Sequence, residues 1–270
     1  MRYFVFLIVI LLFSSCEDVI DLPLTEGSKR LVIDANINWE KETDGNEQII
    51  RLSETRGFYE ETSVLVDADS VYISSGSDKF IFAKQTSGKH EGLYKTNSFI
   101  PEIEREYTLV VKYKGETYTA TEILKGITNI KDTEQSVQNV FGKNSIRVDF
   151  NYTDPGQEEN YYLSEMNSNA FLLNQYWVWR DEFIDGNDDS VFIINEDLKV
   201  GDAVTLSFYG ISKEYHDYMK LLFEQVTPNG PFATTPSAVK GNCINETNPK
   251  NKPLGYFRLC QIDKETHIIK

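Results

Sequence analysis

The chain has 270 residues, 40% of them hydrophobic, and a formal net charge of −15. This acidic balance argues against a nucleic-acid-binding protein, because phosphates demand a basic surface, and against electrostatic adhesion to an anionic membrane. The hydrophobic content is sufficient for buried cores, so the chain is not a disordered acidic tail, and its length predicts one large or two ordinary domains.

After Met1 and the basic Arg2, the chain has an uncharged run, Tyr3–Phe13, that leads into the sequence FSSC. A helix that spans a bilayer needs roughly 20 apolar residues, so this shorter run is typical of a signal-peptide core and not of a permanent span. The small residues Ser14 and Ser15 suit a peptidase site, and FSSC resembles the lipobox of bacterial lipoproteins. We therefore expect residues 1–15 to be a signal peptide and Cys16 to carry a lipid. Ordinary secretion with a free Cys16 thiol is the alternative.

Residues 16–30 are polar and contain Pro23 and Gly27, which predicts a lipidated tether ahead of the first domain. Two acids follow Cys16 directly. They resemble the charged surface-export signal of Bacteroidota lipoproteins. We therefore expect the protein to be lipid-anchored in the outer membrane and to face the cell exterior.

From Leu31 onward the dominant period is two. The segment LVIDANINW alternates apolar and polar side chains, and REYTLVVKYKGETYTATEIL reads as two strands joined by a turn. Turn signals recur about every ten residues, as in immunoglobulin-like folds. The pattern predicts an antiparallel β-sandwich over residues 31–125.

Residues 126–144 are polar and weakly patterned, so we interpret them as an interdomain connection. Alternation resumes at SIRVDF, and SKEYHDYMKLLFEQV has helical spacing with Ser212 as its N-cap. We predict a second β domain over residues 145–270 that carries a helix over residues 212–226. The expected fold class is all-β and mainly antiparallel, with two immunoglobulin-like β-sandwich domains, the second bearing one α-helix.

The sequence contains no HExxH, GxSxG or phosphate-binding loop motif, so we expect no enzyme, no catalytic residues and no cofactor. The acidic segment Asp181–Asp189 could hold Ca²⁺ through carboxylates and carbonyls. It departs from the EF-hand pattern, which has a ligand where Phe183 stands. We interpret the segment as a solvated loop and predict no metal site.

Two tryptophans form a candidate ligand platform. On a strand, Trp177 and Trp179 of NQYWVWRDEF project from one face, where they could stack on a sugar or another flat apolar ligand. The default interpretation is that this face is core, because large aromatic side chains bury much area.

Two cysteines remain if Cys16 carries lipid. Cys243 and Cys260 lie in apolar segments separated by a turn-rich stretch, so a hairpin could bring them onto neighbouring strands. An oxidising compartment would permit a disulfide. A bonded pair and two buried thiols both remain open.

Several segments, taken in order, resemble the Bacteroidota lipoproteins grouped as domain of unknown function 4249. They are CEDVIDL, LVIDANIN, GLYKTNSF, REYTLVVKYKGETYTATEIL, DEFIDG, LSFYGISKEYHDYMKLL, PFATTPSAVKGNCINETNP and LGYF. The resemblance spans nearly the whole mature chain, although Cys243 stands where the family usually has an aliphatic residue. Members are typically encoded beside TonB-dependent receptors, so the resemblance implies an accessory to uptake. It supplies no catalytic residues.

We therefore expect a non-enzymatic lipoprotein that binds the membrane through its N-terminal lipid and docks on a TonB-dependent outer-membrane receptor. A freestanding surface carbohydrate-binding module, with Trp177 and Trp179 as its platform, is the alternative. A hydrolase built on scattered carboxylates is a third and weaker interpretation.

Overall fold

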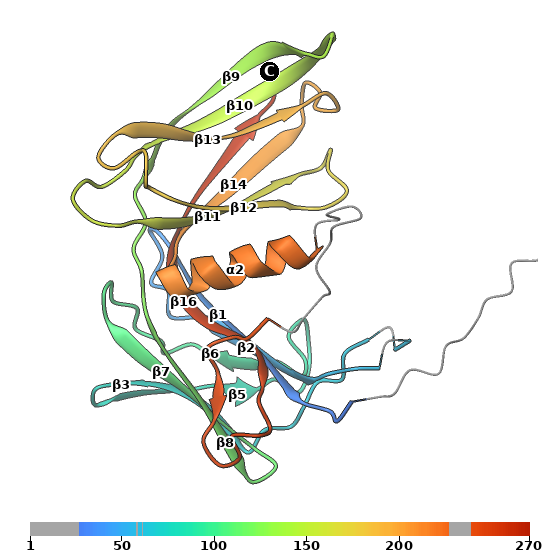
Figure 1. Cartoon of the computed structure of the whole chain (residues 1–270), viewed down its shortest axis with the longest axis vertical. Coiled ribbons are helices and arrows are strands. Elements are labelled where there is room, and N and C mark those ends of the chain that lie inside the picture. The colour runs from blue at the N-terminus through green and yellow to red at the C-terminus, as the bar shows by residue number, and fades with distance from the viewer. Residues whose placement is uncertain (1–26, 58, 61, 227–238) are drawn as a thin grey trace, which may run out of the picture.

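The computed structural model describes residues 27–57, 59–60, 62–226 and 239–270. They form two β-sandwiches stacked along the long axis of the molecule (Figure 1). One eight-stranded sheet runs through both sandwiches, and a smaller sheet faces each half of it. Within the described ranges, no helix combines the length and apolarity needed to cross a bilayer.

The first sandwich packs four strands of the large sheet against a five-stranded sheet. The strands of the large sheet are β1 (Leu31–Glu40), β2 (Gln48–Glu54), β6 (Tyr94–Thr96) and β5 (Ala83–Lys84). The facing strands, in order, are β15 (Ile244–Asn245), β8 (Glu116–Ile123), β7 (Glu106–Tyr113), β3 (Ser70–Ser75) and β4 (Asp78–Ile81). Apolar side chains of the two sheets, including Ile33, Ile73 and Tyr107, meet in one core.

The second sandwich packs the other four strands of the large sheet against three strands. The large sheet contributes β12 (Gln175–Arg180), β11 (Tyr161–Ser168), β14 (Ala203–Gly210) and β16 (Leu254–Ile268). The facing sheet has the order β13 (Asp188–Asn195), β10 (Lys143–Thr153) and β9 (Ile130–Val140). Phe150, Tyr162 and Phe208 are among the buried side chains that fill the space between them.

The helix α2 (Lys213–Val226) lies along the outer face of the large sheet where the two sandwiches meet (Figure 1). Ser212 caps it, because its Oγ accepts the Tyr215 N–H at 3.2 Å. The aromatic rings of Tyr215 and Tyr218 pack on Tyr256 of β16, with centroids 4.9 and 4.8 Å apart. The prediction of a helix capped by Ser212 is confirmed.

The structure confirms an all-β fold with mainly antiparallel pairing and sandwich packing. It also contains a parallel pair that the sequence did not indicate. The first half of β16 pairs in parallel with β1, from Val32 opposite Leu254 to Glu40 opposite Ile262. The second half of β16 pairs antiparallel with β14, from Tyr209 opposite Ile262 onward. A single strand therefore belongs to both sandwiches.

The expected domain boundaries differ from the observed ones in two places. The segment 126–144, which we expected to be a connection, contains the strand β9. This strand lies at the edge of its sheet and has no fully buried side chain, so it lacks the alternation that marks a half-buried strand. The expected second domain, 145–270, also loses residues to the first sandwich, because Phe257 and Leu259 pack in the first core.

Candidate functional site

Three turns at one end of the second sandwich carry exposed apolar side chains. We call these four residues the turn surface: Phe141, Leu172, Leu173 and Val200. They come from the β9–β10, β11–β12 and β13–β14 connections. Single exposed apolar residues are common on protein surfaces, so we treat these four on neighbouring turns as a candidate interaction site only.

Polar contacts hold the three turns together. Lys143 Nζ lies 2.9 Å from Glu196 Oε1, which joins the β9–β10 turn to the β13–β14 connection. Asn169 Nδ2 donates to Asp202 Oδ1 at 2.7 Å, and the Ala203 N–H donates to Asn169 Oδ1 at 3.0 Å. These bonds join the β11–β12 turn to the same connection. Side-chain contacts therefore connect the three turns that carry the exposed apolar residues.

Phe141 occupies an unfavourable backbone conformation. It and Gly142 form the two-residue turn between β9 and β10, with φ angles of 50° and 84°. Asn or Gly usually fills the first position of such a turn, because a bulky side chain is strained at positive φ. The Phe141 side chain is also fully exposed at 103%. Neither packing nor turn geometry explains a phenylalanine at this position, which makes Phe141 a candidate binding residue.

The two tryptophans of the candidate platform lie in different surroundings. Both lie on the inner face of β12, as predicted, but Trp179 is partly buried in the second core. Its ring stacks on Phe208 with centroids 5.8 Å apart and planes at 7°, and its Nε1 donates to the Tyr152 hydroxyl at 3.2 Å. Trp177 lies at the open edge of the sandwich and is 41% exposed. The two rings therefore do not form an open platform together.

The acidic segment is partly buried, unlike the expected solvated loop, because Asp181 is buried. Asp181 and Asp185 lie close to Asp154 of the β10–β11 loop, with carboxylate oxygens within 4.8 Å of one another. Asp154 and Asp181 are buried. Burial, and then the neighbouring Asp181 and Asp185 charges, raise the pKa of Asp154. The sequence could not indicate Asp154, which is distant in the chain and has no ligand motif around it.

Oxygen donors at this spacing could hold Ca²⁺ or Mg²⁺, but each carboxylate already accepts a hydrogen bond. Asp154 accepts the Tyr162 hydroxyl and the Gly186 N–H, the latter at 3.1 Å. Asp181 accepts the Asn160 N–H at 2.8 Å. Asp185 accepts the Gln157 N–H at 2.9 Å. These contacts clamp the two loops together, which gives the cluster a structural role.

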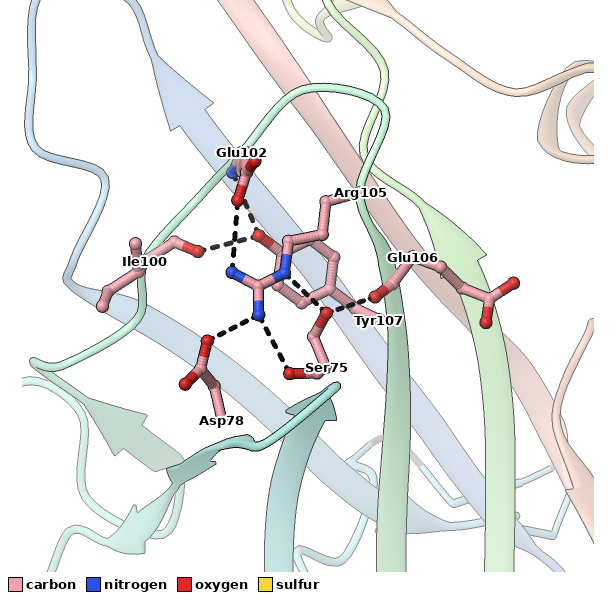
Figure 2. Close-up of polar contacts among 7 residues, drawn as sticks. All are labelled: Ser75, Asp78, Ile100, Glu102, Arg105, Glu106 and Tyr107. Atoms are coloured by element: carbon pink, nitrogen blue, oxygen red, sulfur yellow. Dashed lines mark hydrogen bonds and ion pairs between the residues drawn. The ribbon is translucent and has the colours of Figure 1, made fainter.

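The first sandwich contains an extended polar network around Arg105 (Figure 2). The guanidinium donates to Ser75 through Nε–Oγ and Nη2–O contacts of 2.7 and 2.9 Å, to Asp78 Oδ2 at 2.5 Å and to Glu102 Oε2 at 3.2 Å. These partners lie on the β3–β4 turn and on the loop that enters β7. The network ties these two segments together, so we interpret it as structural.

A buried carboxylate lies at the boundary between the sandwiches. Glu122 of β8 accepts hydrogen bonds from the Ser212 and Tyr256 hydroxyls at 3.2 and 3.4 Å, and from the Ile123 N–H at 3.2 Å. Burial raises its pKa, and the nearby Glu214 charge acts in the same direction. A cavity of about 680 Å³ adjoins it, lined by both sandwiches. The hydrogen bond between Ser212 and Glu122 therefore connects the first sandwich to the start of α2.

The two C-terminal cysteines are free thiols, and both are buried. Cys243 packs in the first core, whereas Cys260 lies under α2 on the other face of the large sheet. The disulfide that the sequence left open is therefore not formed. Burial raises the pKa of Cys243 to about 12, so it remains a protonated thiol. The predicted lipid attachment residue, Cys16, lies outside the described residues.

The solved structures that resemble this chain include two remote ones. A two-domain fibronectin type-III segment from chicken tenascin is 14% identical, with a TM-score of 0.20. The match covers 61% of this chain and 85% of the tenascin chain. The zebrafish (Danio rerio) Fcho1 Mu homology domain with bound Eps15 peptide is 9% identical, with a TM-score of 0.19. The match covers 87% of this chain and 95% of the Fcho1 chain. Neither score supports an argument about fold or function.

The comparison with curated proteins found no match. The comparison with family models found DUF4249, a domain of unknown function, over residues 17–266. This match spans both sandwiches, the helix and most of the shared strand β16, which ends at Ile268. The chain therefore belongs to the DUF4249 family.

Proposed function

We propose that the protein is a non-enzymatic outer-membrane or surface lipoprotein, anchored at Cys16, that docks as an accessory on a TonB-dependent nutrient transporter. The lipobox-like sequence supports the anchor, and the resemblance to Bacteroidota lipoproteins supports the transporter as partner. The turn surface is the structural observation on which the docking part of the proposal rests.

The turn surface suits docking because it serves no visible purpose within the monomer. Phe141 is fully exposed and sits in a backbone conformation that costs stability. Leu172 is 97% exposed, so its apolar area also faces solvent. Burial against a partner would recover about 25 cal/mol for each Å² of apolar surface removed from water.

A protein partner fits this surface better than a bilayer does. The chain is strongly acidic, which disfavours contact with anionic lipid headgroups. The described chain also enters the fold through β1, whose buried side chains belong to the first core, whereas the turn surface belongs to the second sandwich. An anchored molecule could therefore present these turns to a neighbouring membrane protein.

The test is a variant in which Phe141 becomes Asn and Leu172, Leu173 and Val200 become Ser. Affinity purification of the tagged protein from mildly solubilised outer membranes, followed by mass spectrometry, measures the co-purifying receptor. We expect wild type to recover a TonB-dependent receptor in near-equal amount, and the variant to lose about tenfold or more of it, as when an interface loses its central apolar contacts.

The matched control replaces exposed apolar residues of the first sandwich, Ile81 and Ile100, with Ser. This control should retain the receptor. Recovery of the lipoprotein alone from wild-type membranes, or equal receptor recovery with all variants, would contradict the docking proposal. The anchor is tested separately: Cys16→Ala should remove the protein from the outer-membrane fraction, and unchanged fractionation would refute lipidation.

A further inference from the structure

An open cleft lies between the two sheets of the second sandwich, along the edge formed by β12 and β13. Both are the outermost strands of their sheets, so no further strand closes the gap between them. The cleft has a volume of about 520 Å³, within the range of small-molecule sites. We call it the edge cleft, and Ser164, Gln175, Trp177, Trp179, Val191 and Ile193 are among the residues that line it.

The walls of the edge cleft are apolar and come from both sheets. Val191 and Ile193 are inward-facing residues of β13, and Trp177 faces them from β12. Trp179 closes the inner end, because its ring is stacked on Phe208 in the core. Facing sheets pack about 10 Å apart, so the gap between their edges suits a flat ligand. Trp177 offers an aromatic surface at the entrance.

A buried hydroxyl without a hydrogen-bond partner lines the cleft. Ser164 of β11 is 0% exposed, and it lies directly opposite Trp177 in the β11–β12 pairing. Among the described residues, its Oγ finds no hydrogen-bond partner. A polar atom in this state is unfavourable, and buried polar groups in native proteins are normally satisfied. A polar group on a bound ligand would supply the missing partner.

The remaining polar groups of the edge cleft favour some ligand charges over others. Gln175, Asp189 and Ser190 line the cleft beside the apolar walls. Asp189 also accepts the Tyr152 hydroxyl at 3.2 Å, which fixes its carboxylate near the cleft. A negative charge here disfavours an anionic ligand, and the cleft lining includes no basic side chain to attract one.

We propose that the edge cleft binds an uncharged, flat aromatic ring that carries one hydrogen-bonding group, with the ring against Trp177 and the polar group on Ser164 Oγ. This inference is independent of the docking proposal, because the edge cleft and the turn surface share no residue. It differs from the sugar platform that the sequence suggested, since Trp179 is part of the core and the cleft walls are mainly apolar.

The chain's three tryptophans make the test site-specific. Nuclear magnetic resonance of ¹⁵N-labelled protein gives one indole N–H signal each for Trp39, Trp177 and Trp179, assigned with Trp→Phe variants. Phenol is the probe, benzene lacks its hydroxyl, benzoate carries a charge, and glucose tests a sugar. Trp39 is a built-in control, because it lies in the first sandwich and its Nε1 donates to Thr43.

We expect phenol to shift the Trp177 signal saturably and leave the Trp39 signal unchanged. Phenol should bind about 3- to 10-fold more tightly than benzene, the gain expected of one hydrogen bond, and benzoate should bind more weakly than phenol. Ser164→Ala should remove the preference for phenol without loss of thermal stability, because it deletes an unsatisfied hydroxyl. Ser168→Ala is the matched control on the same strand, and it should retain the preference.

Several results would overturn the proposal. They are a Trp177 signal that phenol does not shift saturably, shifts of equal size at all three tryptophans, and an unchanged phenol preference in Ser164→Ala. Saturable binding of glucose without phenol binding would also overturn it and would return the cleft to the sugar interpretation. This test does not use receptor co-purification. Failure of the edge-cleft proposal can therefore be distinguished from failure of the docking proposal.

Discussion

The Ser212 hydroxyl donates to the Glu122 carboxylate at 3.2 Å across the boundary between the two sandwiches. The same hydroxyl accepts the Tyr215 N–H at the start of α2. One side chain therefore caps the helix of the second sandwich and contacts a buried acid of the first. This contact makes the boundary sensitive to the protonation of Glu122.

Glu122→Gln should flatten part of the pH dependence of stability. Burial raises the pKa of Glu122 above the ordinary value of 4.5, so the native protein keeps a proton where the unfolded chain has released it. The free energy of unfolding contributed by this group therefore falls as pH rises from near 4.5 through the raised native pKa. Urea unfolding of both proteins across this interval measures the difference. A wild-type-to-variant difference that is constant with pH would contradict the raised pKa.

Tyr107→Phe should destabilise the first sandwich by about 1–3 kcal/mol, the usual cost of leaving buried polar groups unpaired. The Tyr107 hydroxyl donates to the Ile100 carbonyl at 2.8 Å and accepts the Glu102 N–H at 3.0 Å (Figure 2). Phenylalanine keeps the buried ring but leaves both backbone groups without this partner. Denaturant unfolding measures the loss, and a variant as stable as wild type would show that water replaces the hydroxyl.

Gly210→Ala should destabilise the protein by about 1–3 kcal/mol, the range typical of overpacking. A Cβ at Gly210 would lie 1.8 Å from the Gly126 carbonyl oxygen, because the chain that leads into β9 crosses β14 at this point. Backbone cannot move aside as a flexible side chain does. A melting temperature equal to that of wild type would show that the crossing tolerates a methyl group.

Phe141→Asn should stabilise the isolated protein by about 0.5–1 kcal/mol. Asparagine tolerates the positive φ of the β9–β10 turn, and Phe141 loses no packing because it is fully exposed. Thermal unfolding of the purified protein measures the gain. Loss of stability would mean that the phenylalanine has a structural role in the monomer, and it would weaken the case for the turn surface.

Cys243 and Cys260 should be unreactive toward a thiol reagent in the native protein and fully reactive after denaturation. Both are buried, and burial raises the pKa of each thiol, so little nucleophilic thiolate is present. The variants Cys243→Ser and Cys260→Ser assign the reactive groups after unfolding. Native protein that releases no thiol on denaturation, unless a reductant is added, would indicate a disulfide.

Local sequence patterns predicted the elements whose packing is local. The alternation in LVIDANINW corresponds to β1, in which Leu31, Ile33, Ala35 and Ile37 are buried. Helical spacing and the Ser212 cap located α2. The shared face of Trp177 and Trp179 also followed from strand periodicity.

The features that the sequence did not reveal depend on distant contacts or on weak patterns. β9 has a polar sequence because neither face is fully buried, so its pairing with β10 leaves little trace in composition. The parallel pairing of β1 with β16 joins opposite ends of the chain. Ser164 reads as an ordinary strand residue, and its significance depends on the cleft beside it. No local periodicity encodes such relationships.

The shared strand β16 has a consequence for the order of folding. β1 emerges early in synthesis, but its parallel neighbour β16 emerges only after all the other described strands of both sandwiches. The large sheet that both sandwiches share is therefore incomplete until β16 is available, which raises the contact order and slows folding. Truncation before residue 254 would leave β1 and β14 as unprotected edges, prone to pairing with other chains. Because β16 completes the pairing of both β1 and β14, we expect the two sandwiches to fold as a single cooperative unit.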